Sequence, residues 1–132
     1  MSKEDLKLAI CPGQLWRDTN GFAINAHGGG IMLHEGVYWW YGEHKIYGQA
    51  GNSAHVGVHV YSSTDLVNWD DRGIALAVDT KPTPEHCSAD LGDVPRGSDI
   101  TDGCILERPK VIFCKKTGKF VMYFHLEIYG RG

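Results

Sequence analysis

Short runs of alternating apolar and polar residues, separated by glycine-rich turns, make up most of this chain. The apolar run Gly29–His34, the turn Glu35-Gly36 and the aromatic run Val37–Glu43 predict a β-hairpin. In His55–Ser62 three valines occupy every second position, opposite two histidines and a glycine, which is the period of a third strand. Gly73–Val78 predicts a fourth, outer strand. These segments together predict one antiparallel four-stranded unit.

The segments that flank this unit have weaker patterns. Met1–Gln14 is expected to be a tail with at most one helical turn, and Asp18–Gly21 reads Asp-Thr-Asn-Gly, a turn signal. Ser63–Trp69 begins with Ser, Thr and Asp and continues to Leu and Trp, which predicts one helical turn with its apolar residues under the sheet.

A second hairpin is predicted near the C-terminal end. Its strands are Glu107–Cys114 and Lys119–Glu127, joined by a turn at Lys115–Gly118. The long polar connection Lys81–Gly103 precedes it, and loops of this length in a compact domain are usually functional or poorly ordered.

Four antiparallel strands followed by half of a similar unit are the repeat pattern of an all-β propeller. A blade of about 50 residues means that a closed ring of four or more blades needs at least ~200 residues, so 132 residues hold about one and a half blades. We therefore expect a fragment with a lead-in at 1–26, a first blade at 27–78, a connection at 79–104 and an incomplete second blade at 105–132. Unpaired edges and an uncovered apolar face on the second blade favour self-association.

Composition and charge narrow the function classes. The chain has 17 Gly, six Tyr, four Trp and four Phe, and uncharged aromatic β surfaces suit flat polar ligands such as sugars. A net charge of -3 without a run of Lys or Arg predicts neither nucleic-acid nor membrane partners, and no apolar stretch approaches the ~18 residues of a membrane span.

The cysteines and the N-terminus bear on cellular compartment. Cys11, Cys87, Cys104 and Cys114 form no CxxC pair, so no zinc-ribbon site is expected. Free thiols are expected if the chain is cytoplasmic, and disulfides are the alternative if an upstream leader is missing. The charged N-terminal residues do not resemble a signal peptide, which indicates a cytoplasmic protein, or a secreted one if an upstream leader is missing. No cofactor or metal is expected.

Four motifs, in order, carry a resemblance to a known family. They are Asp18-Thr19-x-Gly21-x-x-Ile24-Asn25-Ala26-His27-Gly28-Gly29-Gly30-Ile31, Tyr38–Glu43, Ser62–Trp69 and Glu107–Ile112. The sequence resembles glycoside hydrolase family 43, in the branch similar to exo-β-1,3-galactanases, over about Trp16–His125. The Ala-His-Gly-Gly-Gly, Tyr-Gly-Glu and Glu-Arg-Pro-Lys-Val motifs are the specific ones, because many sugar-acting propellers carry Ser-x-Asp-Leu-x-x-Trp.

The resemblance implies a five-bladed propeller with an axial active site and inverting hydrolysis of O-glycosidic bonds in galactan-type polysaccharides. A general acid protonates the leaving oxygen while a second group directs water, and in this branch both are expected after Gly132. The chain alone is therefore expected to be inactive. Most family members place a general-base Asp in the first strand, where this chain has His27–Gly30; Asp18 is left open as an exception.

Within that frame, four residues are the candidate site. Glu107 is the auxiliary catalytic carboxylate, which binds and distorts the sugar and tunes the pKa of the proton donor. Glu43, His27 and His125 join it as substrate-binding residues. The alternatives are a solvated strand-end Glu43, an ion pair of Glu107 with its basic neighbours, and a structural His27 between blades.

Other chemistry and other functions remain as alternatives. His55 and His59 lie on one strand face, but four residues apart, so a metal site there is disfavoured. Tyr38–Tyr41 point alternately to both faces and serve mainly as core, with one ring available for sugar stacking; Trp16 and Trp69 are expected in the core. The competing functions are a non-catalytic module that binds β-galactose-containing glycans and a partial propeller that assembles with other chains.

Overall fold

The computed structural model describes residues 6–46, 48, 51–80 and 99–127. These residues form six strands and contain no helix. The strands are β1 (His27–His34), β2 (Val37–His44), β3 (Gly57–Ser63), β4 (Asp70–Ala77), β5 (Ile105–Cys114) and β6 (Lys119–Glu127). The predicted all-β class is confirmed.

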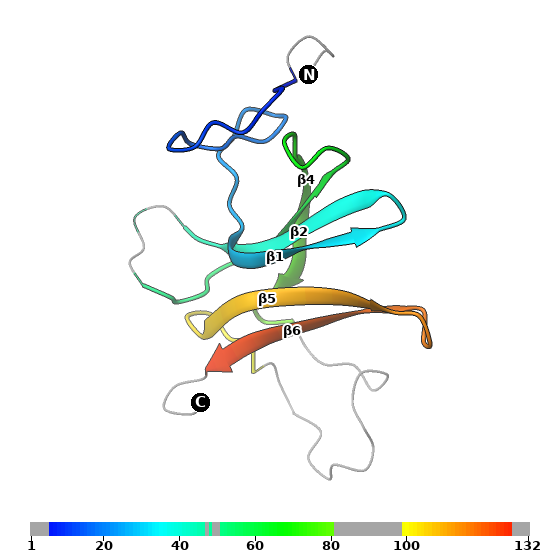
Figure 1. Ribbon diagram of the computed structural model, residues 1–132. Coiled ribbons are helices and arrows are strands. Elements are labelled where there is room, and N and C mark those ends of the chain that lie inside the picture. Colours follow the sequence, from blue (N-terminus) through cyan, green and yellow to red (C-terminus); the bar gives the residue numbers. More distant parts are fainter. Residues whose placement is uncertain (1–5, 47, 49–50, 81–98, 128–132) are drawn as a thin grey trace.

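The strands form two antiparallel sheets (Figure 1). The first has the order β1-β2-β3-β4, and β5 pairs only with β6 in the second. Both hairpins lie where the alternation predicts them, and β6 has the predicted bounds. The fourth strand begins at Asp70, three residues before the predicted start, because its first residues are polar and exposed and so give no alternation signal.

The predicted helical turn at Ser63–Trp69 is wrong. Ser63 Oγ accepts hydrogen bonds from the backbone N–H groups of Asp65 and Leu66, and Asp65 Oδ1 accepts those of Val67 and Asn68. Leu66 has a φ of 65°, which a right-handed helix excludes. The Ser63 and Asp65 side chains take the backbone N–H groups as hydrogen-bond donors, so the segment forms a turn in place of a helix.

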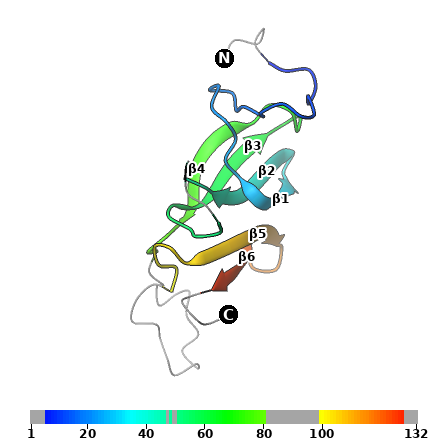
Figure 2. The same cartoon turned by 90° about the vertical axis from the view of Figure 1, so that its left-hand side faces the viewer.

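Strand β3 is buried along its whole length because both faces of the sheet are covered. On one face Val58 packs with Leu106 of β5, together with partly buried apolar residues of β2 and β6. Figure 2 shows the β5–β6 hairpin lying against the four-stranded sheet, and Figure 1 shows β5 beside β1. The hydrophobic contact between the two sheets fixes how β1 and β5 face each other.

The N-terminal segment covers the opposite face of the sheet. Trp69 and Tyr61 are almost fully buried there, and Trp40 lies between Trp16 and Trp69, with ring centroids 5.5 and 5.2 Å away. Trp16 Nε1 also donates to the carbonyl of Val67 at 3.0 Å. Trp69 is core, as predicted, and Trp16 packs partly buried against the same cluster.

The faces of the aromatic run alternate as the sequence predicts. Tyr38 and Trp40 pack against the tryptophan cluster, and Tyr41 packs against the other core. These contacts make the three rings part of the packing between layers. The same alternation places Glu43, two residues after Tyr41, on the side of the sheet that faces β5.

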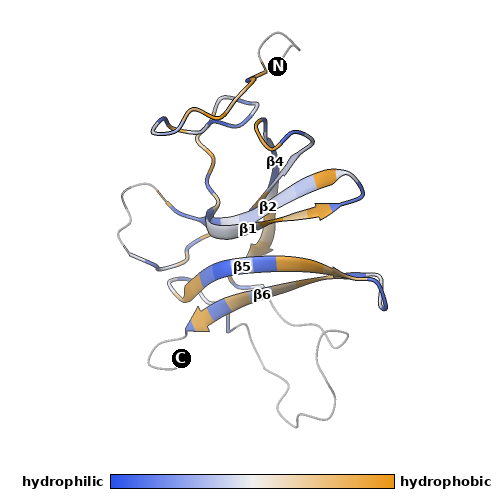
Figure 3. Cartoon of the chain, viewed as in Figure 1, coloured by the Kyte–Doolittle hydropathy of each residue, from blue (hydrophilic) through white to orange (hydrophobic). Residues whose placement is uncertain are grey.

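The second hairpin keeps apolar side chains at its surface. Ile112 is 56% exposed and Tyr123 is 65% exposed. Figure 3 shows a hydrophilic middle stretch in β5 followed by a continuous hydrophobic stretch toward the β5–β6 turn. This is the uncovered face that the sequence predicts; self-association through it stays a prediction.

Parts of the predicted organisation lie outside the described residues. They include residues 81–98 of the long connection, with Cys87, and the first five residues of the tail. The described part of the tail, from Leu6 on, has turns and bends in place of the helical turn. Among the described residues, no helix is long and apolar enough to cross a membrane.

Candidate functional site

A β-bulge interrupts the pairing of β1 with β2. His27 pairs with Glu43, but the next pair is Gly30 with Tyr41, so three steps on β1 match two on β2. Gly28, inside the bulge, has a φ of 57°. Bulges bend a strand and redirect side chains, and they are frequent beside active sites.

The same bulge recurs in the second hairpin. Glu107 pairs with His125 and Lys110 with Tyr123, again three steps against two. Arg108 occupies the place of Gly28 and has a φ of 53°. A non-glycine residue held in this region is uncommon and costs of order 1–3 kcal/mol, so the surrounding structure must impose it.

The repeated bulge sets four predicted site residues in two equivalent pairs. His27 and Glu43 form the pair in the first sheet, and Glu107 and His125 form the pair in the second. In each pair one residue is an acid and the other a histidine, with the positions exchanged. The predicted site residues therefore occupy one structural position that is used twice.

Glu43 connects the two sheets. Its Oε1 accepts a hydrogen bond from the backbone N–H of Arg108 at 2.9 Å, and its Oε2 lies 3.0 Å from Lys45 Nζ. Glu43 is only 8% exposed, so the interpretation as a solvated strand-end residue is wrong. The contact brings the Glu43 carboxylate to the residue next to Glu107.

Glu107 is half-buried and His27 and His125 are exposed. Within the described part of the chain, Glu107 forms no ion pair with Arg108 or Lys110. The Lys110 ammonium donates instead to the backbone carbonyls of β1 and of its own strand. His125 lies 3.2 Å from Glu127.

Two residues that the sequence analysis did not select support Glu43. Asn25 Oδ1 accepts a hydrogen bond from the backbone N–H of Lys45 at 2.8 Å, and Asn25 Nδ2 donates to the Lys45 carbonyl at 2.7 Å. This two-point contact fixes the backbone of Lys45, whose ammonium pairs with Glu43. Asn25 lies inside the first motif, which is the signal that could have found it.

A histidine network lies on the opposite face of β2 and β3. Nδ1 of His44 is 2.9 Å from Nδ1 of His59, and His59 Nε2 is 2.7 Å from Asp71 Oδ1. The hydroxyl of Tyr61 lies 3.5 Å from His59 Nδ1 and accepts the backbone N–H of Asn25 at 3.0 Å. One hydrogen fits between the two Nδ1 atoms, so the two rings cannot both present an Nδ1–H there.

The pKa values of His44 and Asp71 in this network are both lowered. Burial, His59 and His27 lower the pKa of His44, and Asp71 opposes them. For Asp71, burial acts to raise the pKa, but the hydrogen bonds from His59 and the backbone of Gly73, with the two histidine charges, lower it overall.

The two histidines considered for a metal are separated. His55 pairs with Asp102 at 3.0 Å, while His59 pairs with Asp71. No group of three or more His, Cys, Asp or Glu side chains suited to a metal ion occurs among the described residues.

Asp18 is a turn residue. It is 4% exposed, and its Oδ1 accepts the backbone N–H groups of Asn20 at 2.9 Å and Phe22 at 3.0 Å. These bonds close the predicted Asp-Thr-Asn-Gly turn. The structure therefore assigns Asp18 a local role in the lead-in and gives no support to the exception left open for it.

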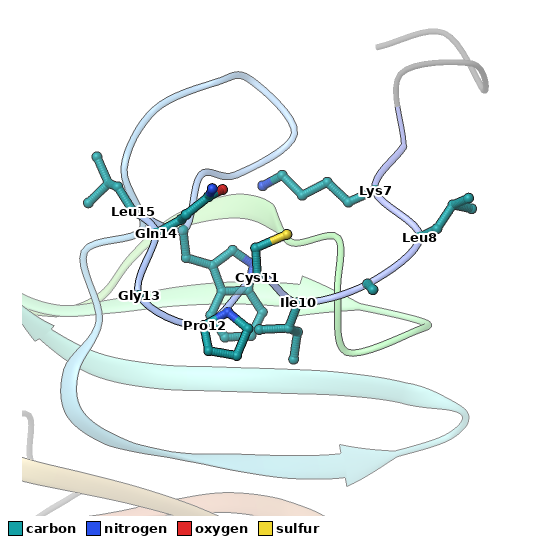
Figure 4. Close-up of a pocket in the computed structure, with 10 residues that line it drawn as sticks. Lys7, Leu8, Ile10, Cys11, Pro12, Gly13, Gln14 and Leu15 are labelled. Carbon is teal, nitrogen blue, oxygen red and sulfur yellow. The ribbon is translucent and has the colours of Figure 1, made fainter.

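A hollow of about 640 Å³ lies elsewhere, in the N-terminal segment (Figure 4). It is formed by residues 7–16, several of them apolar. None of the four predicted site residues lines it, so the repeated bulge remains the candidate site.

Comparisons with solved structures find close matches. A glycoside hydrolase family 43 β-1,3-galactosidase, BT3683, solved with galactodeoxynojirimycin, is 52% identical with a TM-score of 0.73, over 93% of this chain and 31% of that one. The Phanerochaete chrysosporium exo-β-1,3-galactanase Pc1,3Gal43A, solved with galactose, is 33% identical with a TM-score of 0.71, over 93% and 24%. An exo-β-1,3-galactanase from Clostridium thermocellum is 37% identical with a TM-score of 0.65, over 89% and 21%.

The chain spans a third or less of the length of these three structures. No protein-family model matches the chain, and no curated protein does. The identity, the shared fold and the coverage of this chain nevertheless agree with the resemblance found in the motifs.

Proposed function

Starting from the homology of this chain to the exo-β-1,3-galactanases of glycoside hydrolase family 43, we propose that it supplies part of the sugar-binding hub of an inverting galactan hydrolase. The substrate is a β-galactose-containing oligo- or polysaccharide. The observation that carries this proposal is the 2.9 Å hydrogen bond from Arg108 N–H to Glu43, because it joins a candidate residue of the first sheet to the residue that follows Glu107 in the second.

In this proposal the sheets are consecutive wedges of a five-bladed propeller. Residues 27–78 form the first blade, 79–104 the connection and 105–132 the inner half of the second blade. The repeated bulge supports this arrangement, since a blade-by-blade repeat explains why β1 and β5 deviate at the same step. First strands of neighbouring blades then meet at the hub.

The two carboxylates have different surroundings and therefore different roles. Glu43, held on both oxygens by Arg108 N–H and Lys45, is a fixed acceptor for a sugar hydroxyl. Glu107 is half-buried and acts as the auxiliary carboxylate, which binds the sugar, favours its distortion and tunes the proton donor. His27 and His125 complete the two pairs as hydroxyl partners.

Inverting hydrolysis requires a proton donor and a water-directing group on opposite sides of the scissile bond, ~6.5–9.5 Å apart. Glu43 and Glu107 are both assigned to sugar binding, and neither is assigned as the proton donor. The proposal therefore expects the 132-residue chain to bind galactose without cleaving β-1,3-galactobiose.

The test is an NMR titration of the chain with β-1,3-galactobiose, followed by a turnover assay. We expect shifts of the Arg108 amide and of the Glu43 and Glu107 carboxyl carbons at millimolar sugar, and no hydrolysis. Glu43→Gln and Glu107→Gln should weaken binding, while Glu35→Gln, at an exposed turn, should not. An absence of shifts at millimolar sugar removes the binding role, and robust turnover refutes the assignment of the proton donor.

A second function is favoured by the surface of the second hairpin. Ile112 and Tyr123 are more than half exposed, and β5 and β6 each pair with only one strand in the described structure. A partial propeller that assembles with further chains would use these surfaces, whereas a non-catalytic glycan-binding module would use Glu43, Glu107 and the aromatic rings. Light scattering distinguishes this alternative, because a clean monomer contradicts assembly.

A further inference from the structure

We propose that Lys110 is a positioning residue: its ammonium acts as a tethered cation that holds the bulges of β1 and β5 together. The inference rests on the proposed function only in that these bulges carry the candidate sugar-binding residues. The contact itself can be measured without sugar.

The Lys110 ammonium lies among four backbone carbonyl oxygens. Two belong to the β1 bulge, Gly29 at 3.0 Å and Gly28 at 3.2 Å, and two belong to its own strand, Arg108 at 3.4 Å and Pro109 at 3.5 Å. The two shortest contacts therefore cross between the sheets. An ammonium has three donors and no acceptor, so a cluster of carbonyls suits it.

The bulges explain why these carbonyls need a donor. A bulge leaves a residue unpaired and interrupts the ladder of hydrogen bonds at that point. The contacts with Gly28, Gly29 and Arg108 are exposed and the one with Pro109 is partly buried, so water competes for these carbonyls; a charged donor binds them more strongly than a neutral one. Lys110 thus contacts both interrupted segments with a single charge.

Gly30 makes room for the lysine. A Cβ built at Gly30 would lie 2.7 Å from Lys110 Cδ and 3.3 Å from its Cε. The aliphatic part of Lys110 therefore crosses β1 where the glycine lacks a side chain. The third glycine of the triple-glycine motif has a specific partner on the next hairpin.

Lys110 and Glu43 link the same bulges in opposite directions. The Glu43 carboxylate of the first sheet accepts a hydrogen bond from the Arg108 N–H of the second. The Lys110 ammonium of the second sheet donates to the carbonyls of Gly28 and Gly29 in the first. Loss of the lysine contact should loosen the spacing that the Glu43 contact requires. The Arg108 amide is therefore the reporter of the Lys110 contact.

The main test is amide hydrogen exchange of Lys110→Met, which keeps the aliphatic length and removes the charge. We expect exchange at the Arg108 amide to rise about tenfold without sugar, while amides in the centre of β3 change little. Methylammonium at high concentration should restore protection, because it supplies N–H donors. Tetramethylammonium, which has no N–H, should not restore it.

Two further variants cover the case in which Lys110→Met does not fold. Gly30→Ala keeps every charge but intrudes on the lysine stem, and it should raise Arg108 exchange in the same direction. Lys119→Met, an exposed lysine at the far end of the same hairpin, is the charge-matched control and should leave Arg108 unchanged.

Unchanged Arg108 protection in Gly30→Ala and in a folded Lys110→Met refutes the inference. It is also refuted if both methylammonium and tetramethylammonium restore the protection of the Arg108 amide, or if neither does. Failure of the wild-type chain to bind galactobiose would refute the proposed function but would leave this result standing. The two failures are thus distinguishable.

Discussion

The backbone N–H of Arg108 donates a 2.9 Å hydrogen bond to Oε1 of Glu43, across 65 residues of sequence and from one sheet to the other. Arg108 adopts a left-handed backbone conformation, with a φ of 53°, at this contact. Strained residues persist where their surroundings impose them, and such positions cluster at functional sites. The contact brings the Glu43 carboxylate to the residue that follows Glu107.

The first prediction concerns the stability role of Glu43. Glu43→Ala removes the acceptor of Arg108 N–H and the partner of Lys45 in a largely buried position. We expect a loss of about 1–3 kcal/mol in the free energy of unfolding, measured by urea denaturation. Glu35→Ala, in an exposed turn, removes the same charge and is the control, although its φ of 49° adds a small strain term. Equal losses in both variants would show that the Glu43 contacts contribute nothing.

The second prediction concerns Gly29. A Cβ at this residue would lie 1.6 Å from the Tyr41 carbonyl oxygen, which is backbone and cannot turn aside. Gly29→Ala should therefore disrupt the pairing of β1 with β2 and cost more than about 3 kcal/mol, as severe core defects do. Gly36→Ala, at the hairpin turn with open space but a φ of 79°, should cost only about 1 kcal/mol. Thermal unfolding followed by circular dichroism separates the two, and similar midpoints would contradict the predicted clash.

The third prediction is a pH dependence with two windows. The pKa of His44 is lowered in the folded chain, so the unfolded chain binds the extra proton first, and stability falls as the pH drops through about 6.5. The pKa of Asp71 is also lowered, so its contribution is present above its unfolded value and is lost as the pH falls through the folded value. Urea midpoints measured from pH 8 to pH 3 should decline in both windows.

His44→Gln is the variant that isolates the upper window. It removes the titrating ring next to His59, so the decline between pH 7 and pH 5 should flatten while the lower window remains. His55→Gln, whose ring pairs with Asp102 away from the network, is the matched control. An unchanged upper window in His44→Gln would assign it to another group.

The fourth prediction concerns the turn that replaced the expected helix. Burial acts to raise the pKa of Asp65, but hydrogen bonds from the backbone and side chain of Asn68, from Val67 N–H and from Ser63 lower it to about 2. Carboxyl carbon NMR should find Asp65 titrating near that value. Asp65→Ala should cost about 1 kcal/mol in stability, as loss of a capping carboxylate does, whereas Asp65→Asn keeps an acceptor and should cost less. Titration of Asp65 near its ordinary value would contradict the turn.

The sequence predicts the strands well because their signals are local. Alternation and turn residues locate both hairpins, and the bounds Lys119–Glu127 agree with β6. The same local logic fails at Ser63–Trp69, where side-chain hydrogen bonds to nearby amides replace the helical pattern. Burial of β3 on both faces also escapes a pattern of alternation, because it depends on what the rest of the chain packs there.

The candidate site divides in the same way. Motif resemblance selects Glu43, Glu107, His27 and His125, and the pairing places them at equivalent bulges. Asn25 and Lys110 lie inside the first and the last motif, but their contacts with Lys45 and Gly28, 20 and 82 positions away, are not visible in any local pattern. The side chains of these residues find their partners only after the chain has folded.

The most direct test of the central claim is a crystal structure of this chain with galactodeoxynojirimycin, the compound bound in the solved structure of BT3683. We predict that the bound iminosugar contacts the carboxylates of both Glu43 and Glu107. Ordered binding elsewhere, such as in the hollow formed by residues 7–16, with both carboxylates free of the compound, would contradict a shared sugar site.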